Sequence, residues 1–227
     1  MDILGGAFAL RLARGMVFHL LRAMGDSVSD ADWAGLFVEA METGVRNDEF
    51  GWCGICRGEA YYRTVSVWNP CPHQVKHVRL ISGRNSPDYS FDIENVHTED
   101  PNQLGEMILG IWNARITDVR KKFATTRTVV LVKGDDLSTV SVFEEEALKY
   151  LPEEYEWEWN QRGNLEGYVK GTDIKKFTWQ PHGSQFTITT NVPDNRLKIR
   201  IRHPPLFDRE SVLAQLKFDP SWIEVVK

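Results

Sequence analysis

The sequence reads SPDYSFDIENVH from Ser86 to His97, at the centre of a region (residues 58–133) whose pattern predicts three strands, a helix and a fourth strand. Side chains in a strand alternate between its two faces. Alternation here predicts a core-facing set, Tyr89, Phe91 and Ile93, and a polar set, Asp88, Ser90, Asp92 and Glu94. Two of these carboxylates, Asp92 and Glu94, are two residues apart, a spacing that suits a shared divalent cation.

The flanking segments give the element order. Residues 61–69 and 75–82 are rich in β-forming residues and predict the first two strands. Downstream, Asp100 and Pro101 are typical of a helix start, and apolar residues then recur at helical spacing as far as Phe123. The continuous apolar run at residues 128–132 predicts a strand buried on both faces in the middle of a sheet, and residues 139–143 predict a returning strand.

Both ends of the chain add elements to this region. Residues 6–24 and a segment capped by Ser29 predict two consecutive helices, which suit either scaffold packing or a helix-turn-helix with an acidic second helix. After residue 150, short β-like runs predict strands at 155–159, 165–169, 176–180, 185–190 and 197–202, followed by a helix at 208–216 and a strand at 222–226. We therefore expect an α+β fold: a mixed-sheet core flanked by helices in residues 1–150, with an antiparallel β-rich extension, residues 151–227, packed on it.

Composition limits the functional classes. The chain has 227 residues, 42% of them hydrophobic, and a net charge of −5, so any nucleic-acid contact must come from a local basic patch. The first residues carry Asp2 and interior arginines, which is wrong for a secretory signal and too interrupted for a membrane span. With an odd number of cysteines, we expect a reducing, cytoplasmic setting. The glycine patterns of P-loop and dinucleotide-binding proteins are absent from the sequence.

The order helix, three strands, helix, strand over about residues 5–145, with Pro87-Asp88 and Asp92-Ile93-Glu94, resembles the core of the PD-(D/E)xK nuclease superfamily, which includes many restriction endonucleases. The resemblance implies a magnesium-dependent endonuclease that hydrolyses phosphodiester bonds in double-stranded DNA. Its acidic site would comprise Asp88, Asp92 and Glu94, with Asp92 and Glu94 on the metal. Glu59 or Glu106 would complete the site, and Glu94 stands where the family usually has lysine.

Two alternatives to this site remain open. A second acidic set, Asp136 with Glu144 and Glu146, lies on a predicted hairpin and ranks behind the first because Asp135-Asp136 is typical of a turn. Asp92 and Glu94 also suit an ordinary solvated strand face. The alternative function is a non-catalytic module, with or without a stabilising zinc ion, that binds nucleic acid or protein. A homodimer would suit a nuclease that reads a palindrome.

A basic stripe near the end of the chain is the second functional candidate. Strand alternation places Leu197, Ile199 and Ile201 on one face and four cations, Arg196, Lys198, Arg200 and Arg202, on the other. On an acidic protein, this stripe suits contact with a phosphate backbone. It also suits protection of a sheet edge, or pairing with the acidic run at residues 153–158.

Two further motifs have functional interpretations. The loop region that contains Gln180, His182, Ser184 and Gln185 has the donors and acceptors that read base edges, or is a simple turn. Cysteine and histidine side chains at Cys53, Cys56, Cys71 and His73 have a spacing compatible with zinc, or are small residues at strand edges.

Overall fold

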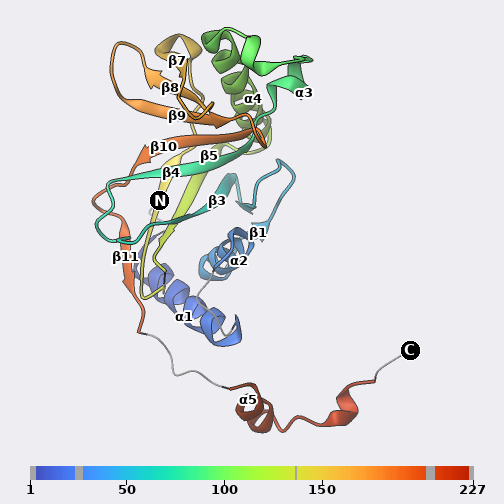
Figure 1. Cartoon of the computed structure of the whole chain (residues 1–227). Helices are drawn as coiled ribbons and strands as arrows, with labels where there is room; N and C mark the ends of the chain where they lie inside the picture. Colours follow the sequence, from blue (N-terminus) through green and yellow to red (C-terminus); the bar gives the residue numbers. More distant parts are fainter. Residues whose placement is uncertain (1–3, 24–27, 136, 203–207, 225–227) are drawn as a thin grey trace.

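The structure, a computed structural model, describes residues 4–23, 28–135, 137–202 and 208–224. Its helices are α1 (Gly6–Ala23), α2 (Asp30–Met41), α3 (Pro87–Phe91), α4 (Pro101–Lys122) and α5 (Arg209–Gln215), with short 3₁₀ turns η1 (Val96–Thr98), η2 (Pro152–Glu154) and η3 (Pro220–Trp222). Its strands are β1 (Val45–Arg46), β2 (Gly54–Arg57), β3 (Ala60–Trp68), β4 (His77–Arg84), β5 (Thr125–Lys133), β6 (Thr139–Glu146), β7 (Tyr155–Trp159), β8 (Leu165–Val169), β9 (Lys175–Gln180), β10 (Gln185–Asn191) and β11 (Leu197–Arg200). The expected α+β class is confirmed (Figure 1).

The strands form two sheets. Sheet A has the order β1-β2-β3-β5-β6-β11, and sheet B has the order β4-β10-β9-β8-β7. In sheet A, β3 and β5 are parallel, and the chain between them includes α4; the other pairs in both sheets are antiparallel. Residues 129–132 of β5 are fully buried, which confirms the prediction of a central strand covered on both faces.

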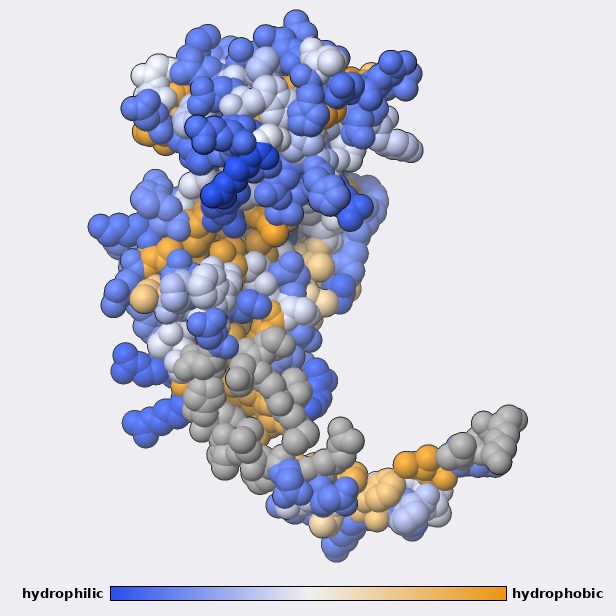
Figure 2. Space-filling model, in the orientation of Figure 1, coloured by the Kyte–Doolittle hydropathy of each residue, from blue (hydrophilic) through white to orange (hydrophobic). Residues whose placement is uncertain are grey.

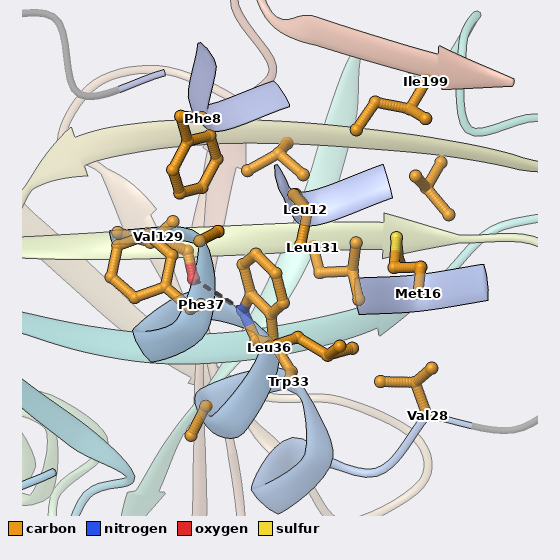
Figure 3. Close-up of a cluster of buried hydrophobic side chains, with 14 of the residues drawn as sticks. Phe8, Leu12, Met16, Val28, Trp33, Leu36, Phe37, Val129, Leu131 and Ile199 are labelled. Atoms are coloured by element: carbon orange, nitrogen blue, oxygen red, sulfur yellow. Dashed lines mark hydrogen bonds between the residues drawn. The ribbon is translucent and has the colours of Figure 1, made fainter. Parts of the chain in front are cut away.

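Helices α1 and α2 cover one face of sheet A. Trp33 and Phe37 of α2 are buried against β3 and β5, and the indole Nε1 of Trp33 donates a hydrogen bond to the Val129 carbonyl at 3.3 Å (Figure 3). Phe8 and Leu12 of α1 pack into the same cluster. Because the apolar stripes of both helices are used in this core, the scaffold interpretation of the helix pair is confirmed.

Sheet B and α4 cover the other face of sheet A. Val78 and Leu80 of β4 pack directly on Val130 of β5, while α4 lies between sheet A and strands β7–β9. Gly105 of α4 permits this close packing, because a Cβ atom there would lie 2.4 Å from the ring of Trp157 in β7. The packing of Trp157 against Gly105 compensates for the low helix propensity of glycine.

Two helix starts follow the sequence prediction. The Asp100 carboxylate accepts hydrogen bonds from the Asn102 and Gln103 backbone amides, at 3.0 and 3.1 Å, and Pro101 occupies the first helical position of α4. Ser29 and Asp32 form a reciprocal capping box at the start of α2. Both caps satisfy amides that have no partner inside the helix.

Two strand predictions are wrong. The segment from Ser86 to His97 forms α3, a bend and the start of η1, because Pro87 starts a helical turn and Asp92 ends it with a left-handed backbone, φ 56°. Tyr89, predicted to face a core, is 91% exposed. Residues 220–222 form η3 and residues 223–224 are irregular, while the rest of the predicted strand at 222–226 lies outside the described residues. Across the described ranges, no helix is long and apolar enough to span a membrane.

Candidate nucleic-acid interface

The acidic segment does not form a strand face. Asp88 lies in the first turn of α3, Asp92 is the residue that ends this helix, and Glu94 follows in an irregular stretch; all three are exposed. The backbone therefore does not align them by strand alternation, which corrects the expected geometry. Within the described residues, no group of three or more His, Cys, Asp or Glu side chains is placed to hold a metal ion.

The two supplementary carboxylates lie at opposite ends of α4. Glu59 is exposed in the turn before β3, and its carbonyl accepts a hydrogen bond from the amide of Thr125, just after the end of α4. Glu106 is exposed in the second turn of α4, sixteen residues before Lys122. At about 1.5 Å per residue, that stretch of helix is about 24 Å long, so the two carboxylates cannot share one ion.

The second acidic set consists partly of structural ion pairs. The carboxylate of Glu144 lies 2.9 Å from Nε of Arg127, and that of Glu146 lies 3.0 Å from Arg120. Asp136 lies outside the described residues.

The cysteine and histidine candidates lie apart. Cys53 and Cys56 lie in or beside β2, whereas Cys71 follows the end of β3. The Thr64 amide of β3 donates a hydrogen bond to the Cys53 carbonyl, and β3 continues for four residues beyond Thr64 before the chain reaches Cys71. Four residues of strand span about 13 Å, too far for shared coordination of one zinc ion. Nε2 of His73 lies 3.0 Å from the Val140 carbonyl and 3.1 Å from the Ile199 carbonyl, so this ring bridges β6 and β11.

The polar loop at residues 181–184 joins β9 to β10. His182 is exposed, and Gln180 pairs with Gln185 at the base of the hairpin. The Ser184 carbonyl accepts a 2.8 Å hydrogen bond from the Asn85 amide, which fixes the loop to the residue just before Ser86 and α3. Two candidates that the sequence left separate, this loop and the acidic segment, are therefore neighbours.

The basic stripe lies on the edge strand of sheet A. Lys198, Arg200 and Arg202 are exposed, while Ile199 and Ile201 are buried, as alternation predicted. Arg196 differs from the other three cations, because its guanidinium donates to the carbonyls of Pro193 and His73. Pairing with the acidic run at 153–158 is wrong, since β7 is the outermost strand of the other sheet.

Two hollows lie along β11. The first, of about 450 Å³, is lined by side chains that include Arg127, Glu144, Asn195, Arg196 and Lys198. The second, of about 430 Å³, lies between α1 and β11, and Arg14, Arg200 and Arg202 are among its lining residues. Each hollow therefore combines residues of the predicted basic stripe with a further arginine from another element, Arg127 of β5 or Arg14 of α1.

This arrangement gives an edge of positive charge on a protein with net charge −5. In the described residues, no ion pair joins Lys198, Arg200 or Arg202 to a carboxylate. From Lys198 to Arg202 the chain advances about 13 Å, enough to follow more than one phosphate of a nucleic-acid strand. Chemically, the edge can bind anionic groups.

A second group of charges, which the sequence analysis missed, lies between the two sheets. Arg63, Thr128 and Glu145 are aligned across β3, β5 and β6, and the Thr190 hydroxyl of β10 donates to the Glu145 carboxylate. Lys176 of β9 attracts the same carboxylate. We call Arg63, Glu145 and Lys176 the inter-sheet charges.

The surroundings of these charges change their pKa values. Burial raises the pKa of the Glu145 carboxyl, and the Thr190 hydrogen bond, Lys176 and Arg63 offset part of this rise. Burial also lowers the pKa of Lys176, and it lowers that of Arg63 to about 10. Arg63 donates to the Ile81 carbonyl and lies 5.3 Å from the Trp52 ring centroid and 5.5 Å from that of Trp112. Charged residues inside the β-rich runs YYRTVSV and KKFTW were the sequence signal for this cluster.

Comparison of this chain with protein-family models, with curated protein sequences and with solved structures finds no match.

Proposed function

We propose that this protein binds nucleic acid through the edge of sheet A, with Lys198, Arg200 and Arg202 of the β11 region contacting the phosphate backbone. The observation that carries the proposal is the gathering of these exposed cations with Arg14 along one edge, where no ion pair among the described residues joins Lys198, Arg200 or Arg202 to a carboxylate. Arginine and lysine side chains supply most of the sequence-independent affinity for phosphates. The remainder of an acidic protein would repel the ligand, so the binding orientation is restricted to this edge.

The test is fluorescence anisotropy with labelled double-stranded DNA, single-stranded DNA and RNA over a range of salt concentrations. The test variant is Lys198→Glu with Arg200→Glu, and the matched control is Lys149→Glu with Lys170→Glu, which makes the same change in net charge at exposed positions elsewhere. We expect the test variant to bind about 30-fold more weakly, on the basis of about 1 kcal/mol for each of the two lost phosphate contacts. Absence of binding by the wild type, or an equal loss in both variants, would contradict the proposal.

A second candidate function is metal-dependent cleavage of the bound nucleic acid by the acidic segment, as the nuclease resemblance implies. The bond between Ser184 and Asn85 favours it, because it places the polar loop with His182 beside the segment that carries Asp88 and Asp92. Magnesium prefers carboxylate oxygens and retains several waters, so two carboxylates can be enough to bind it.

Cleavage of mixed plasmid and phage DNA with Mg²⁺, Mn²⁺ or EDTA tests this second candidate. The variant Asp92→Ala with Glu94→Ala should lose metal-dependent cleavage and keep binding, because both residues are exposed and distant in sequence from the β11 edge. The double variant Glu153→Ala with Glu154→Ala is the control at exposed carboxylates. If the wild type binds DNA but leaves it intact under all three conditions, the cleavage proposal fails and the binding proposal stands.

A further inference from the structure

The C-terminal part of the described chain forms an exposed arm, residues 208–224, that contains α5 and η3. Figure 1 shows it standing apart from the body of the protein. Leu216, Trp222 and Ile223 are 63%, 64% and 63% exposed, and apolar side chains are visible along the arm in Figure 2. Several large apolar side chains gathered on one exposed segment are typical of an interaction surface.

The arm has local structure and negative charge. The carboxylates of Asp208 and Asp219 accept hydrogen bonds from the amides of Ser211 and Ser221, at 2.9 and 2.8 Å, and so cap α5 and η3. The rings of Phe218 and Trp222 make an edge contact at 5.6 Å. The sequence of residues 208–224 has four acidic and two basic residues, which gives a net charge of −2.

The second of the two hollows, which we call the α1–β11 groove, is complementary to the arm because it is apolar and positively charged. Its apolar lining is Ala13, Val17, Phe18, Leu21 and Ile201, and its charged lining is Arg14, Arg200 and Arg202. Phe18 is 64% exposed. Ala13, Val17 and Ile201 also contact the core beneath sheet A. The apolar lining that the core cluster does not include is therefore Phe18 and Leu21 of α1.

We propose that the arm of one copy of this protein docks in the α1–β11 groove of a second copy. The apolar side chains of the arm would cover Phe18 and Leu21 of α1, and its carboxylates would lie near the groove arginines. A reciprocal exchange gives a symmetric dimer with two identical contacts. In this structure the arm does not lie in the groove of its own copy, which leaves that groove open to the arm of a second copy (Figure 1).

The inference is independent of the proposed nucleic-acid binding, although both involve Arg200 and Arg202. A docked arm would bring negative charge to these arginines, so dimer formation and nucleic-acid binding should weaken each other by the same factor. The hollow lined by Arg127, Arg196 and Lys198 does not include groove residues of α1 and stays open in the dimer.

Sedimentation velocity of the full chain over a hundredfold concentration range tests the proposal. The arm variant is Leu216→Ala with Trp222→Ala, and the groove variant is Phe18→Glu. Leu10→Glu is the matched control, since Leu10 lies on the same helix, is 55% exposed and does not line the groove. We expect a concentration-dependent dimer for the wild type and the control, with the dimer dissociation constant raised about tenfold or more by either test variant, which corresponds to at least about 1.4 kcal/mol.

A mixture of the two test variants separates arm exchange from other modes of association. The arm variant has an intact groove and the groove variant has an intact arm, so the mixture regains one of the two contacts and should dimerise more strongly than either variant alone. Circular dichroism of each variant verifies that it is folded.

Three outcomes of the sedimentation experiments would overturn the proposal. They are a wild type that is monomeric at all concentrations, a dimer that the arm variant leaves unchanged, and a mixture that associates no better than its components. The difference in tryptophan emission between the wild type and Trp222→Phe isolates the signal of Trp222 from that of the other tryptophans. If Phe18→Glu changes this difference in a monomer, independent of concentration, the groove holds the arm of the same copy and the second copy is rejected as its occupant.

Discussion

Two groups of charged side chains in this protein differ in what surrounds them. Between the sheets, Arg63 is 3% exposed, and its guanidinium contacts a carbonyl and two tryptophan rings, while Glu145 accepts a hydrogen bond from Thr190. Along β11, Lys198 and Arg200 are exposed on an edge strand. The difference indicates that the inter-sheet charges hold the fold together, whereas the edge charges are available for a ligand.

The largest effect should come from breaking the inter-sheet group. Arg63→Met removes a positive charge that stabilises the half-buried Glu145 carboxylate. The free energy of unfolding should therefore fall by about 3–5 kcal/mol. Urea denaturation measures the change. Arg79→Met, at an exposed position of β4, is the control. A loss below about 1 kcal/mol would show that water satisfies Glu145 and that the two groups of charges do not differ in the way described.

A smaller effect is expected at the hydrogen bond to Glu145. Thr190→Val keeps the side-chain shape and removes the hydroxyl donor, so the free energy of unfolding at neutral pH should fall by about 1–3 kcal/mol. Thr189→Val, next to it on β10 and less buried, is the control. Equal effects of the two substitutions would locate the loss in strand packing and not in the carboxylate.

The pH dependence of stability should also distinguish the inter-sheet charges from the exposed charges of β11. Because the pKa of Glu145 is raised in the folded protein, the folded state holds this proton more tightly than the unfolded chain does. The resulting stabilisation is complete below the unfolded pKa, about 4.3 for glutamate, and is lost as pH rises through the folded pKa. Relative to Glu145→Gln, the wild type should therefore lose stability as pH rises through this window.

Denaturation of both proteins across the acid range measures this change, with Glu153→Gln as the control at an exposed carboxyl. A constant difference between wild type and Glu145→Gln at every pH would contradict a raised folded-state pKa.

The smallest stability effect should occur at the edge. Lys198→Gln removes one exposed charge, so the free energy of unfolding should stay within about 0.5 kcal/mol of the wild type. The slope of log affinity for nucleic acid against log salt should fall by about 1. Thermal denaturation and salt-dependent anisotropy measure the two quantities. A large loss of stability would assign Lys198 to the scaffold and remove the contrast with Arg63.

Local patterns predicted much of the fold. The run at residues 128–132 became the buried strand β5, and Asp100 with Pro101 started α4, because burial on two faces and helix capping each require particular residues at adjacent positions. Alternation failed at Ser86–His97. There the same spacing of polar and apolar residues occurs in a short helix and a bend, and no strand in the described part of the chain pairs with this segment to select the extended form.

The candidate sites were predictable to different extents. The exposed cations of β11 followed from alternation alone. The arginines that join them, Arg14 and Arg127, come from α1 and β5, more than sixty residues away in the chain, so only the packing of these elements places them at the same edge. Likewise, the hydrogen bond from Asn85 to Ser184 connects the polar loop with the acidic segment across almost one hundred residues.

The sequence by itself determined the α+β class, the positions of most strands and helices, and the basic stripe, because these depend on residues that are close along the chain. Tertiary structure alone decided that Arg63, Glu145 and Lys176 meet between two sheets, that Arg196 is held by backbone carbonyls, and that an arginine-lined groove lies beside α1. The physical reason is that burial and electrostatic compensation depend on distances between atoms of different elements. A linear pattern does not contain those distances until the sheets have packed.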